Sequence, residues 1–382
     1  MALTVGIIGL PLSGKTALFN ALTGAGAEIS GYPTSTVQAN RAVVQVPDER
    51  LTRLSEIYHP RKTTPTAIEF IDVAGLGQAT GEARREGLSA EFLGHIRSAD
   101  ALAIVVRCFE SATAPHPAGG IDGVRDIEDL LTELAITDLA TVVRRRESTA
   151  RKAKSGDKSI QTELDMLDKI RDHLNEGKPA SSLDMTAQEQ ALVRELFLLT
   201  MKPHLYVVNV SEDALAEAPA TLVGEGSATG EQGCVAAMRD RARAEGAEIV
   251  AVSAKLEAEL SELSPEDAAE YLGSLGLPKL GADRVVQAGY RALNLISFLT
   301  AGEDEVRAWT VTRGDKAPQA AGKIHTDFER GFIRAEVVAY DDLMKSGGSM
   351  KTAREHGLVR LEGRDYVVRD GDIIEFRFNV GR

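Results

Sequence analysis

The amino-acid sequence predicts an α/β fold, in which a mainly parallel sheet is covered by helices, interrupted by a helical hairpin and followed by a small α+β domain. Three observations support this prediction. Short apolar runs alternate with stretches of helical periodicity in the N-terminal part of the chain. Two long helical stripes interrupt that alternation. From about Leu299 onward, short β-type runs alternate with turns.

A set of short apolar runs is typical of buried strands in a parallel sheet. Several of these runs stop at a polar residue or glycine, namely Gly9, Asp72, Asn209 and Ser253. Nearly continuous apolar character is expected where helices cover both faces of a sheet. The predicted strands are Val5–Ile8, Ala42–Val46, Thr66–Ile71, Ala101–Val106, His204–Val208 and Glu248–Val252.

Two apolar stripes between the fourth and fifth predicted strands indicate an antiparallel helical hairpin. One runs from Val124 to Val142 and the other from Ile160 to Leu174, each with helical spacing. The segment from Arg144 to Lys158, near the predicted tip, holds seven basic and two acidic residues. Such a run is either a solvated helix face or a local RNA-binding patch.

The C-terminal part has a different pattern, which predicts a separate α+β domain. Its β-type runs are Val306–Val311, Ile333–Val338, Asp365–Val368 and Ile373–Phe378.

The composition excludes several functional classes. The chain has 382 residues and a formal net charge of −13, which argues against a surface that coats nucleic acid, so no DNA partner is expected. No apolar run is long enough to span a membrane, and Met1–Gly6 looks like a first strand rather than a signal peptide. Cys108 and Cys234 fit neither a metal site nor a disulfide framework. We therefore expect a reducing, cytoplasmic location.

A phosphate-binding loop is predicted at Gly9–Thr16. Its sequence GLPLSGKT fits the pattern G-x-x-x-x-G-K-[ST] and lies between a predicted strand and a predicted helix. Gly14 and its neighbours can turn backbone N–H groups toward phosphate oxygens, aided by the helix dipole. Lys15 would reach the β- and γ-phosphates, and Thr16 would present its hydroxyl to Mg²⁺. The chain is therefore predicted to be a nucleoside triphosphatase.

Further residues fit a site for a triphosphate and Mg²⁺. Asp72 follows the third predicted strand, where a carboxylate can hold Mg²⁺, usually through water. Gly75 would donate a backbone N–H to the γ-phosphate. Thr34 and Thr36 lie in a loop without periodicity, and either could reach Mg²⁺ when the γ-phosphate is present. Their spacing from the phosphate loop favours neither.

The segment after the fifth predicted strand predicts a preference for adenine. GTPases usually carry Asn-Lys-x-Asp there, whereas this chain has Asn209-Val210-Ser211-Glu212. The Asp of that motif accepts hydrogen bonds from guanine, and adenine presents the opposite donor and acceptor pattern. We therefore expect a lost guanine preference, with Asn209 free to contact adenine. Ser253 lies where the last loop beside the base should be.

The residue that orients the attacking water is not the usual one. Many GTPases have Gln after the Gly that corresponds to Gly75, whereas this chain has Leu76, which cannot orient water. Slow hydrolysis or another catalytic group is implied. His116, in a loop flanked by prolines, is a candidate, although a solitary loop histidine is more often merely solvated.

These residues resemble the Obg-like ATPases, or YchF family, of the TRAFAC class of P-loop proteins. The resemblance covers nearly the whole chain. It rests on Tyr32-Pro33 with Thr36, DVAGL at 72–76, VRCFE at 106–110, VRDIE at 124–128 and NVSE at 209–212. More specific still are LTAGEDEVRAWT at 299–310, APQAAG at 317–322 and HTDFERGF at 325–332, which look like the TGS domain that closes the family's chains.

The resemblance implies a domain organisation and an activity. It implies an OBG-type G domain at residues 1–123 and 200–276, an inserted coiled-coil hairpin at 124–199 and a β-grasp TGS domain at 297–380. It also implies an ATPase that hydrolyses GTP less readily and associates with ribosomes or ribosomal RNA. Two alternatives stay open: a ribosome- or RNA-binding module with nucleotide as a conformational ligand, and a conventional GTPase with a degenerate base motif.

The resemblance also assigns residues. It implies Mg²⁺ at Thr16 and Thr36 and base contacts at Asn209 and Val210. His116 matches a histidine proposed as catalytic in the family, eight residues after Cys108, so Lys15 and His116 are the predicted catalytic residues. In place of Asn and Val in the family's usual loop, GxPNVGKS, this chain has Leu12 and Ser13, so K⁺ dependence is not expected. The implied ATP-phosphate contacts are Leu12, Ser13, Gly14, Lys15, Thr16 and Ala17.

Overall fold

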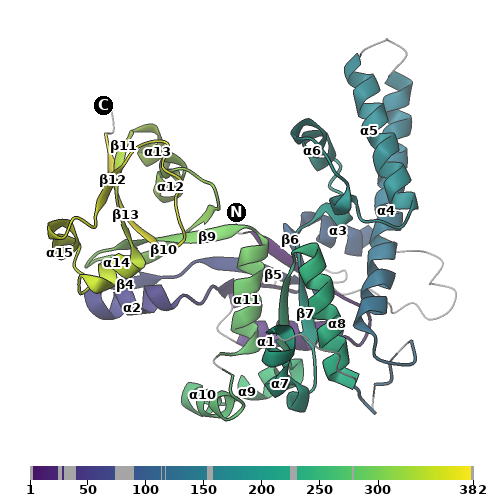
Figure 1. The fold of residues 1–382 in the computed structure, drawn as a ribbon, viewed down its shortest axis with the longest axis horizontal. Coiled ribbons are helices and arrows are strands. Elements are labelled where there is room, and N and C mark those ends of the chain that lie inside the picture. The colour runs from purple at the N-terminus through teal and green to yellow at the C-terminus, as the bar shows by residue number, and fades with distance from the viewer. Residues whose placement is uncertain are drawn as a thin grey trace. The chain divides into compact units, whose positions relative to one another are not determined.

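The protein divides into two compact units. The computed structural model describes residues 3–24, 28–29, 40–73, 90–112, 114–116, 118–152, 158–223, 230–277 and 279–379. One unit comprises Met1–Val43 with Glu69–Gly289, and the other comprises Val44–Ile68 with Tyr290–Arg382. Figure 1 shows the elements of both units. Each unit has a sheet and apolar clusters of its own.

The first unit contains a seven-stranded sheet in the order β2-β3-β5-β1-β6-β7-β8. The strands β5, β1, β6, β7 and β8 pair in parallel, and β2 is antiparallel to β3. The α/β class and the parallel sheet are therefore confirmed. The bounds are β1 (Thr4–Ile8), β2 (Glu28–Ile29), β3 (Asn40–Gln45), β5 (Ala67–Asp72), β6 (Ala101–Arg107), β7 (His204–Asn209) and β8 (Glu248–Val252).

Helices pack against this sheet through apolar faces. Buried residues such as Ile104 on β6 and Val208 on β7 share a core with Leu134 and Met238 from two of these helices. The α-helices of the first unit are α1 (Lys15–Gly24), α3 (Ala90–Ser98), α4 (Gly123–Lys152), α5 (Lys158–Asn175), α6 (Ala187–Arg194), α7 (Glu212–Val223), α8 (Gly230–Glu245), α9 (Ala254–Leu260), α10 (Pro265–Ser274) and α11 (Gly281–Ala292).

The helical hairpin consists of α4 and α5, which lie side by side as a long arm in Figure 1. Val142 of α4 packs with Met166 and Ile170 of α5 in a small core of its own. The basic run is partly neutralised, because Arg145 pairs with Glu163 at 2.7 Å and Arg146 pairs with Asp168. At the base, the buried Asp138 carboxylate accepts hydrogen bonds from the backbone N–H groups of Leu199 and Thr200. Short 3₁₀ turns occur at Ala180–Ser182 and Leu199–Met201.

The second unit has a six-stranded sheet in the order β12-β11-β13-β9-β10-β4. One part of its core lies under α12 and includes Phe298 and Ala320, and another lies under α2 and includes Leu54 and Leu299. Its strands are β4 (Lys62–Thr64), β9 (Leu295–Ala301), β10 (Glu305–Thr312), β11 (Phe332–Ala339), β12 (Arg360–Glu362) and β13 (Asp372–Phe378). Its helices are α2 (Glu49–Tyr58), α12 (Ala317–Ile324), α13 (Thr326–Arg330), α14 (Tyr340–Lys345) and α15 (Met350–Glu355).

Two features of the second unit differ from what the sequence indicates. Val44–Ile68 lies within the range 1–123 predicted for the first domain, yet it supplies α2 and β4 to this unit. The predicted strand Asp365–Val368 forms only an isolated bridge between Lys316 and Val367. The Asp372 carboxylate accepts the Tyr366 hydroxyl at 2.6 Å and the Arg369 N–H at 2.8 Å, which favours a turn over an extended ladder.

The cysteines also correct an expectation. Cys108, which follows β6, and Cys234 of α8 form a disulfide with their Cα atoms 5.7 Å apart. The two residues are 126 positions apart, so sequence spacing gave no indication of the pairing. Of the helices that the structure describes, none combines the length and the apolar character that crossing a membrane requires.

Candidate functional site

The phosphate loop joins β1 to α1 at the carboxyl edge of the parallel strands. Steric constraints explain why two of its positions are glycine. Gly9 and Gly14 have φ angles of 157° and 94°. A side chain at Gly9 would clash with the carbonyl oxygen of Val105, and one at Gly14 would clash with the amide of Asn209. Only glycine fits such close approaches at these φ angles.

Leu12 carries backbone strain within this loop. Its φ angle of 61° lies in the left-handed region, which is unfavourable for leucine, and its side chain is 53% exposed. Asn tolerates that region better because its short polar side chain can bond locally. The position where the family's loop usually has Asn is therefore one at which backbone conformation favours Asn over Leu.

Lys15 turns back on its own loop. Its Nζ donates hydrogen bonds to the carbonyl oxygens of Gly9 at 2.8 Å and Leu10 at 2.7 Å. Burial lowers the pKa of Lys15 to about 8, and the nearby Asp72 carboxylate opposes that shift. The hydrogen-bond acceptors of the Lys15 ammonium group are therefore uncharged carbonyl oxygens, so a negatively charged phosphate would stabilise its charged form.

Thr16 and Asp72 come together as a metal site requires. The Thr16 hydroxyl donates to Asp72 Oδ2 at 3.3 Å. Asp72 is 3% exposed, and its Oδ1 is buried without a hydrogen-bond partner among the described residues. Burial raises the pKa of Asp72, against the effects of Lys15 and Thr16. An unpartnered carboxylate oxygen beside a hydroxyl fits the hard oxygen ligands that Mg²⁺ prefers. Thr36 and Gly75, like Thr34 and Leu76, lie outside the described residues.

The residues predicted to lie beside the nucleotide base make contacts within the protein. The Asn209 amide donates to the Ser13 carbonyl at 3.0 Å, and its oxygen accepts the Ala254 N–H at 3.0 Å. These two bonds use the oxygen and one of the two amide N–H groups of Asn209, so a contact with adenine stays a prediction for its second N–H group. Val210 is buried in the core, and Ser253 is 2% exposed at the start of α9.

Glu212 is also engaged. The Tyr271 hydroxyl of α10 donates to its carboxylate. This bond raises the pKa of Tyr271. The side chain at the position of the guanine-reading Asp therefore has a protein donor.

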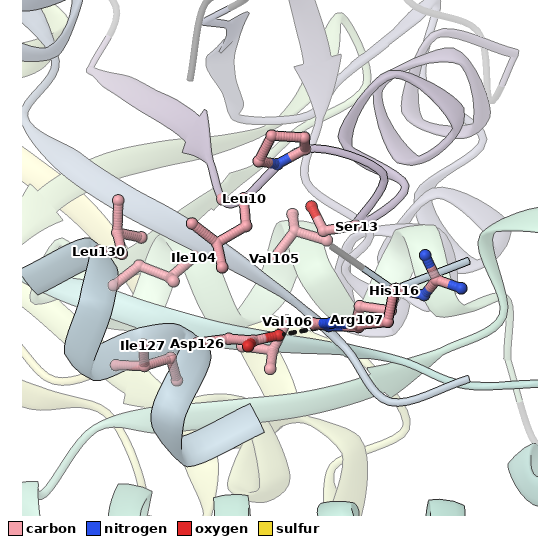
Figure 2. Close-up of a pocket in the computed structure, with 12 residues that line it drawn as sticks. Leu10, Ser13, Ile104, Val105, Val106, Arg107, His116, Asp126, Ile127 and Leu130 are labelled. Carbon is pink, nitrogen blue, oxygen red and sulfur yellow. Dashed lines mark hydrogen bonds and ion pairs between the residues drawn. The ribbon is translucent and has the colours of Figure 1, made fainter. Parts of the chain in front are cut away.

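His116 lies beside the phosphate loop. A cavity of about 10 Å³ is lined by Gly9, Leu10, Pro11 and Ser13 on one side and by Arg107, His116 and Asp126 on the other (Figure 2). His116 Nε2 lies 2.8 Å from Asp126 Oδ2, and both side chains are almost fully buried. The structure thus brings the histidine to the loop but ties it to the first turn of α4.

Sequence reasoning missed three residues of this region. Arg107, which is 3% exposed, donates to the carbonyl oxygens of Phe109 and Ala114, and its Nη1 lacks a hydrogen-bond partner among the described residues. Asp126 and Tyr271 were likewise not singled out. Asp126 offered one signal, since it is an acidic residue in the first turn of a predicted helix.

Comparisons with known proteins decide the family. A family model described as a 50S ribosome-binding GTPase matches residues 4–145, and the model of the YchF GTPase C-terminal region, described as a protein of unknown function, matches residues 295–379. The chain is 48% identical to the ribosome-binding ATPase YchF of Bacillus subtilis over 380 residues, with both chains fully covered. The chain belongs to the YchF family. Among YchF proteins, that of Escherichia coli O157:H7 is 44% identical over the same length.

A solved structure supports the same assignment. The YchF GTPase of Schizosaccharomyces pombe superposes with a TM-score of 0.80 at 33% identity, covering 98% of this chain and 97% of the other. The suspected family is therefore confirmed. The match with this YchF structure covers nearly the whole chain, and it also confirms the predicted α/β fold class. The individual site residues and the domain boundaries stay predictions.

Substitution of Leu12 by Asn should stabilise the protein. We expect the free energy of unfolding to rise by about 1 kcal/mol, because Asn occupies the left-handed region at lower cost. Urea denaturation followed by circular dichroism measures this. Leu12→Ala is the matched control, since alanine has a Cβ as asparagine does but no side chain that can hydrogen-bond locally. Equal stability of the Asn and Ala variants would show that the loop is not strained there.

Nucleotide binding should take up a proton at alkaline pH. Lys15 with a pKa of about 8 is largely neutral at pH 8.5, and a bound triphosphate favours its charged form. Affinity for Mg·ATP should therefore fall as pH rises through 8. Calorimetry in buffers of different ionisation enthalpy should detect greater proton uptake at pH 8.5 than at pH 7. Equal uptake at both values would contradict the lowered pKa.

Proposed function

We propose that this protein is a P-loop ATPase that hydrolyses ATP to ADP and phosphate at the loop Gly9–Thr16. One observation carries the proposal: Lys15, Thr16 and the partly unpaired carboxylate of Asp72 converge at the end of β1 and β5. Names of the relatives support it, since the Bacillus subtilis and Escherichia coli proteins are both called ribosome-binding ATPases.

Each group has a definite part in this reaction. A water attacks the γ-phosphorus, the bond to the oxygen bridging the β- and γ-phosphates breaks, and ADP leaves. The start of α1, preceded by Gly14, supplies backbone N–H groups for the phosphates. Lys15 would exchange its bonds to Gly9 and Leu10 for phosphate oxygens. The Thr16 hydroxyl and Asp72, the latter through water, would hold Mg²⁺, with Thr36 as a further predicted ligand. When bound, Mg²⁺ neutralises charge that develops on the phosphate oxygens.

The base preference rests on Glu212. A carboxylate that reads guanine must have its oxygens free to accept two hydrogen bonds. Here the Tyr271 hydroxyl already donates to Glu212, and Val210 replaces the lysine that packs on guanine in GTPases. A guanine base would meet a carboxylate that already accepts from the Tyr271 hydroxyl at one oxygen, whereas adenine does not need this carboxylate. ATP is therefore preferred, and GTP is a weaker substrate.

The ribosome is the proposed partner. The relatives' names support this, and so does the long hairpin of α4 and α5, whose length exposes a large surface. The pairing of Arg145 and Arg146 with carboxylates weakens the case for a simple basic patch. The contact is therefore not expected to depend on the basic run alone.

A second candidate function is favoured by the state of His116. Both of its ring nitrogens are hydrogen-bonded within the protein, and Leu76 stands where many GTPases have Gln. Nucleotide would then act mainly as a conformational ligand of a ribosome-binding module, with slow hydrolysis. Measuring both the rate of ATP hydrolysis and the affinity for ATP separates the two candidates, because tight binding with slow hydrolysis is expected only of the second.

Removal of the Lys15 ammonium tests the activity. Lys15→Ala should lower ATP turnover by at least about a hundredfold, since a positioned charge on the transferring phosphate contributes that much or more. A phosphate-release assay measures it with ATP and GTP in parallel. Lys178→Ala, which removes an exposed lysine, should behave as the wild type. Undiminished turnover in Lys15→Ala would place hydrolysis elsewhere.

A further inference from the structure

His116 has no ring nitrogen left for water. Its Nε2 lies 2.8 Å from Asp126 Oδ2, and the Ala118 N–H donates to its Nδ1 at 3.2 Å. A carboxylate accepts and a backbone N–H donates, so these partners assign the imidazole proton to Nε2. In this arrangement the ring can neither take a proton from a water molecule nor orient one.

Asp126 is itself firmly placed. Its Oδ1 accepts two hydrogen bonds from Arg125, at 3.2 Å and 2.9 Å, while Oδ2 faces His116. Arg125 also donates to the Gly120 carbonyl at 2.8 Å, so the end of the loop is tied to the same helix turn. The carboxylate is only 6% exposed, and bonds in such surroundings are little weakened by solvent.

The loop that carries His116 is anchored at its other end by β6. Arg107 donates to the carbonyl oxygens of Phe109 at 3.1 Å and Ala114 at 2.6 Å. This leaves His116 in the wall of the cavity shown in Figure 2, which the phosphate-loop residues Leu10 and Ser13 also line. Among the described residues, the hydrogen bonds that hold the ring in this orientation are those with Asp126 and with the Ala118 N–H.

We propose that Asp126 is a positioning residue that restrains His116 and so limits the hydrolysis of ATP. The inference rests on the proposed ATPase function and on His116 as the group that replaces glutamine. Asp126 occupies the first turn of α4, a single helix of 30 residues that also forms the hairpin. A displacement of α4 that reaches this first turn would separate Asp126 from His116 and free the ring.

Removal of the carboxylate should accelerate the enzyme. In steady-state assays at saturating ATP, Asp126→Ala should raise kcat by up to about tenfold with little change in KM, because a charge-assisted hydrogen bond no longer holds the ring. Asp126→Asn keeps an acceptor of lower strength and should lie between the wild type and Asp126→Ala. If Asp126→Ala fails to fold, the Asn variant carries the test alone.

Controls separate restraint from general loosening. Asp129→Ala removes an exposed acid from the same helix and should leave kcat unchanged. In a His116→Ala background, Asp126→Ala should give no gain, because there is no ring to release. A kcat at or below that of the wild type in both Asp126 variants, or a gain that persists without His116, overturns the inference. Failure of the proposed ATPase function would give a different result, because Lys15→Ala would then leave ATP turnover unchanged in every variant.

Discussion

The Asn209 side chain is the contact on which the site depends. Its amide joins three segments that are far apart in the sequence: the phosphate loop at Ser13, the end of β7, and the start of α9 at Ala254. Asn209 is 4% exposed and bonds through one amide N–H and through its oxygen, so its loss would leave the buried Ser13 carbonyl and Ala254 N–H unpaired at a cost of about 1–3 kcal/mol each. Gly14 must lack a side chain because this amide lies against it. The shape of the phosphate loop is thus fixed from the base side of the site.

The groups suited to a ligand are held by the protein itself. Lys15 binds carbonyl oxygens of its own loop, His116 binds Asp126, and Glu212 binds Tyr271. A nucleotide must compete with such internal bonds, so affinity measures the difference between two sets of contacts. Phosphates compete well for Lys15 because carbonyl oxygens carry no formal charge. Guanine competes poorly for Glu212, since one carboxylate oxygen already accepts from the Tyr271 hydroxyl and Val210 offers no lysine to pack on the base.

The sequence predicted the fold where local pattern determines structure. The strands from Val5 to Val252 are apolar runs, and their bounds in the structure agree to within a residue or two. The phosphate loop followed from spacing alone. Pairings that depend on a loop's path or on tertiary packing could not be predicted. Asp126 lies only 10 residues from His116, but their contact depends on the conformation of the loop between them, and the pairing of Cys108 with Cys234, 126 residues apart, depends on how the helices pack on the sheet. The internal partners of Asn209 could not be predicted either, because they lie 196 and 45 residues away.

The P-loop site with its altered base motif is expected to select adenine. Equilibrium dissociation constants for Mg·ATP and Mg·GTP, measured by titration calorimetry on the same wild-type preparation, test it most directly. We expect tighter binding of ATP, because the Glu212 carboxylate already accepts from the Tyr271 hydroxyl and position 210 carries valine in place of lysine. Tighter binding of GTP would contradict it and would identify a conventional guanine site.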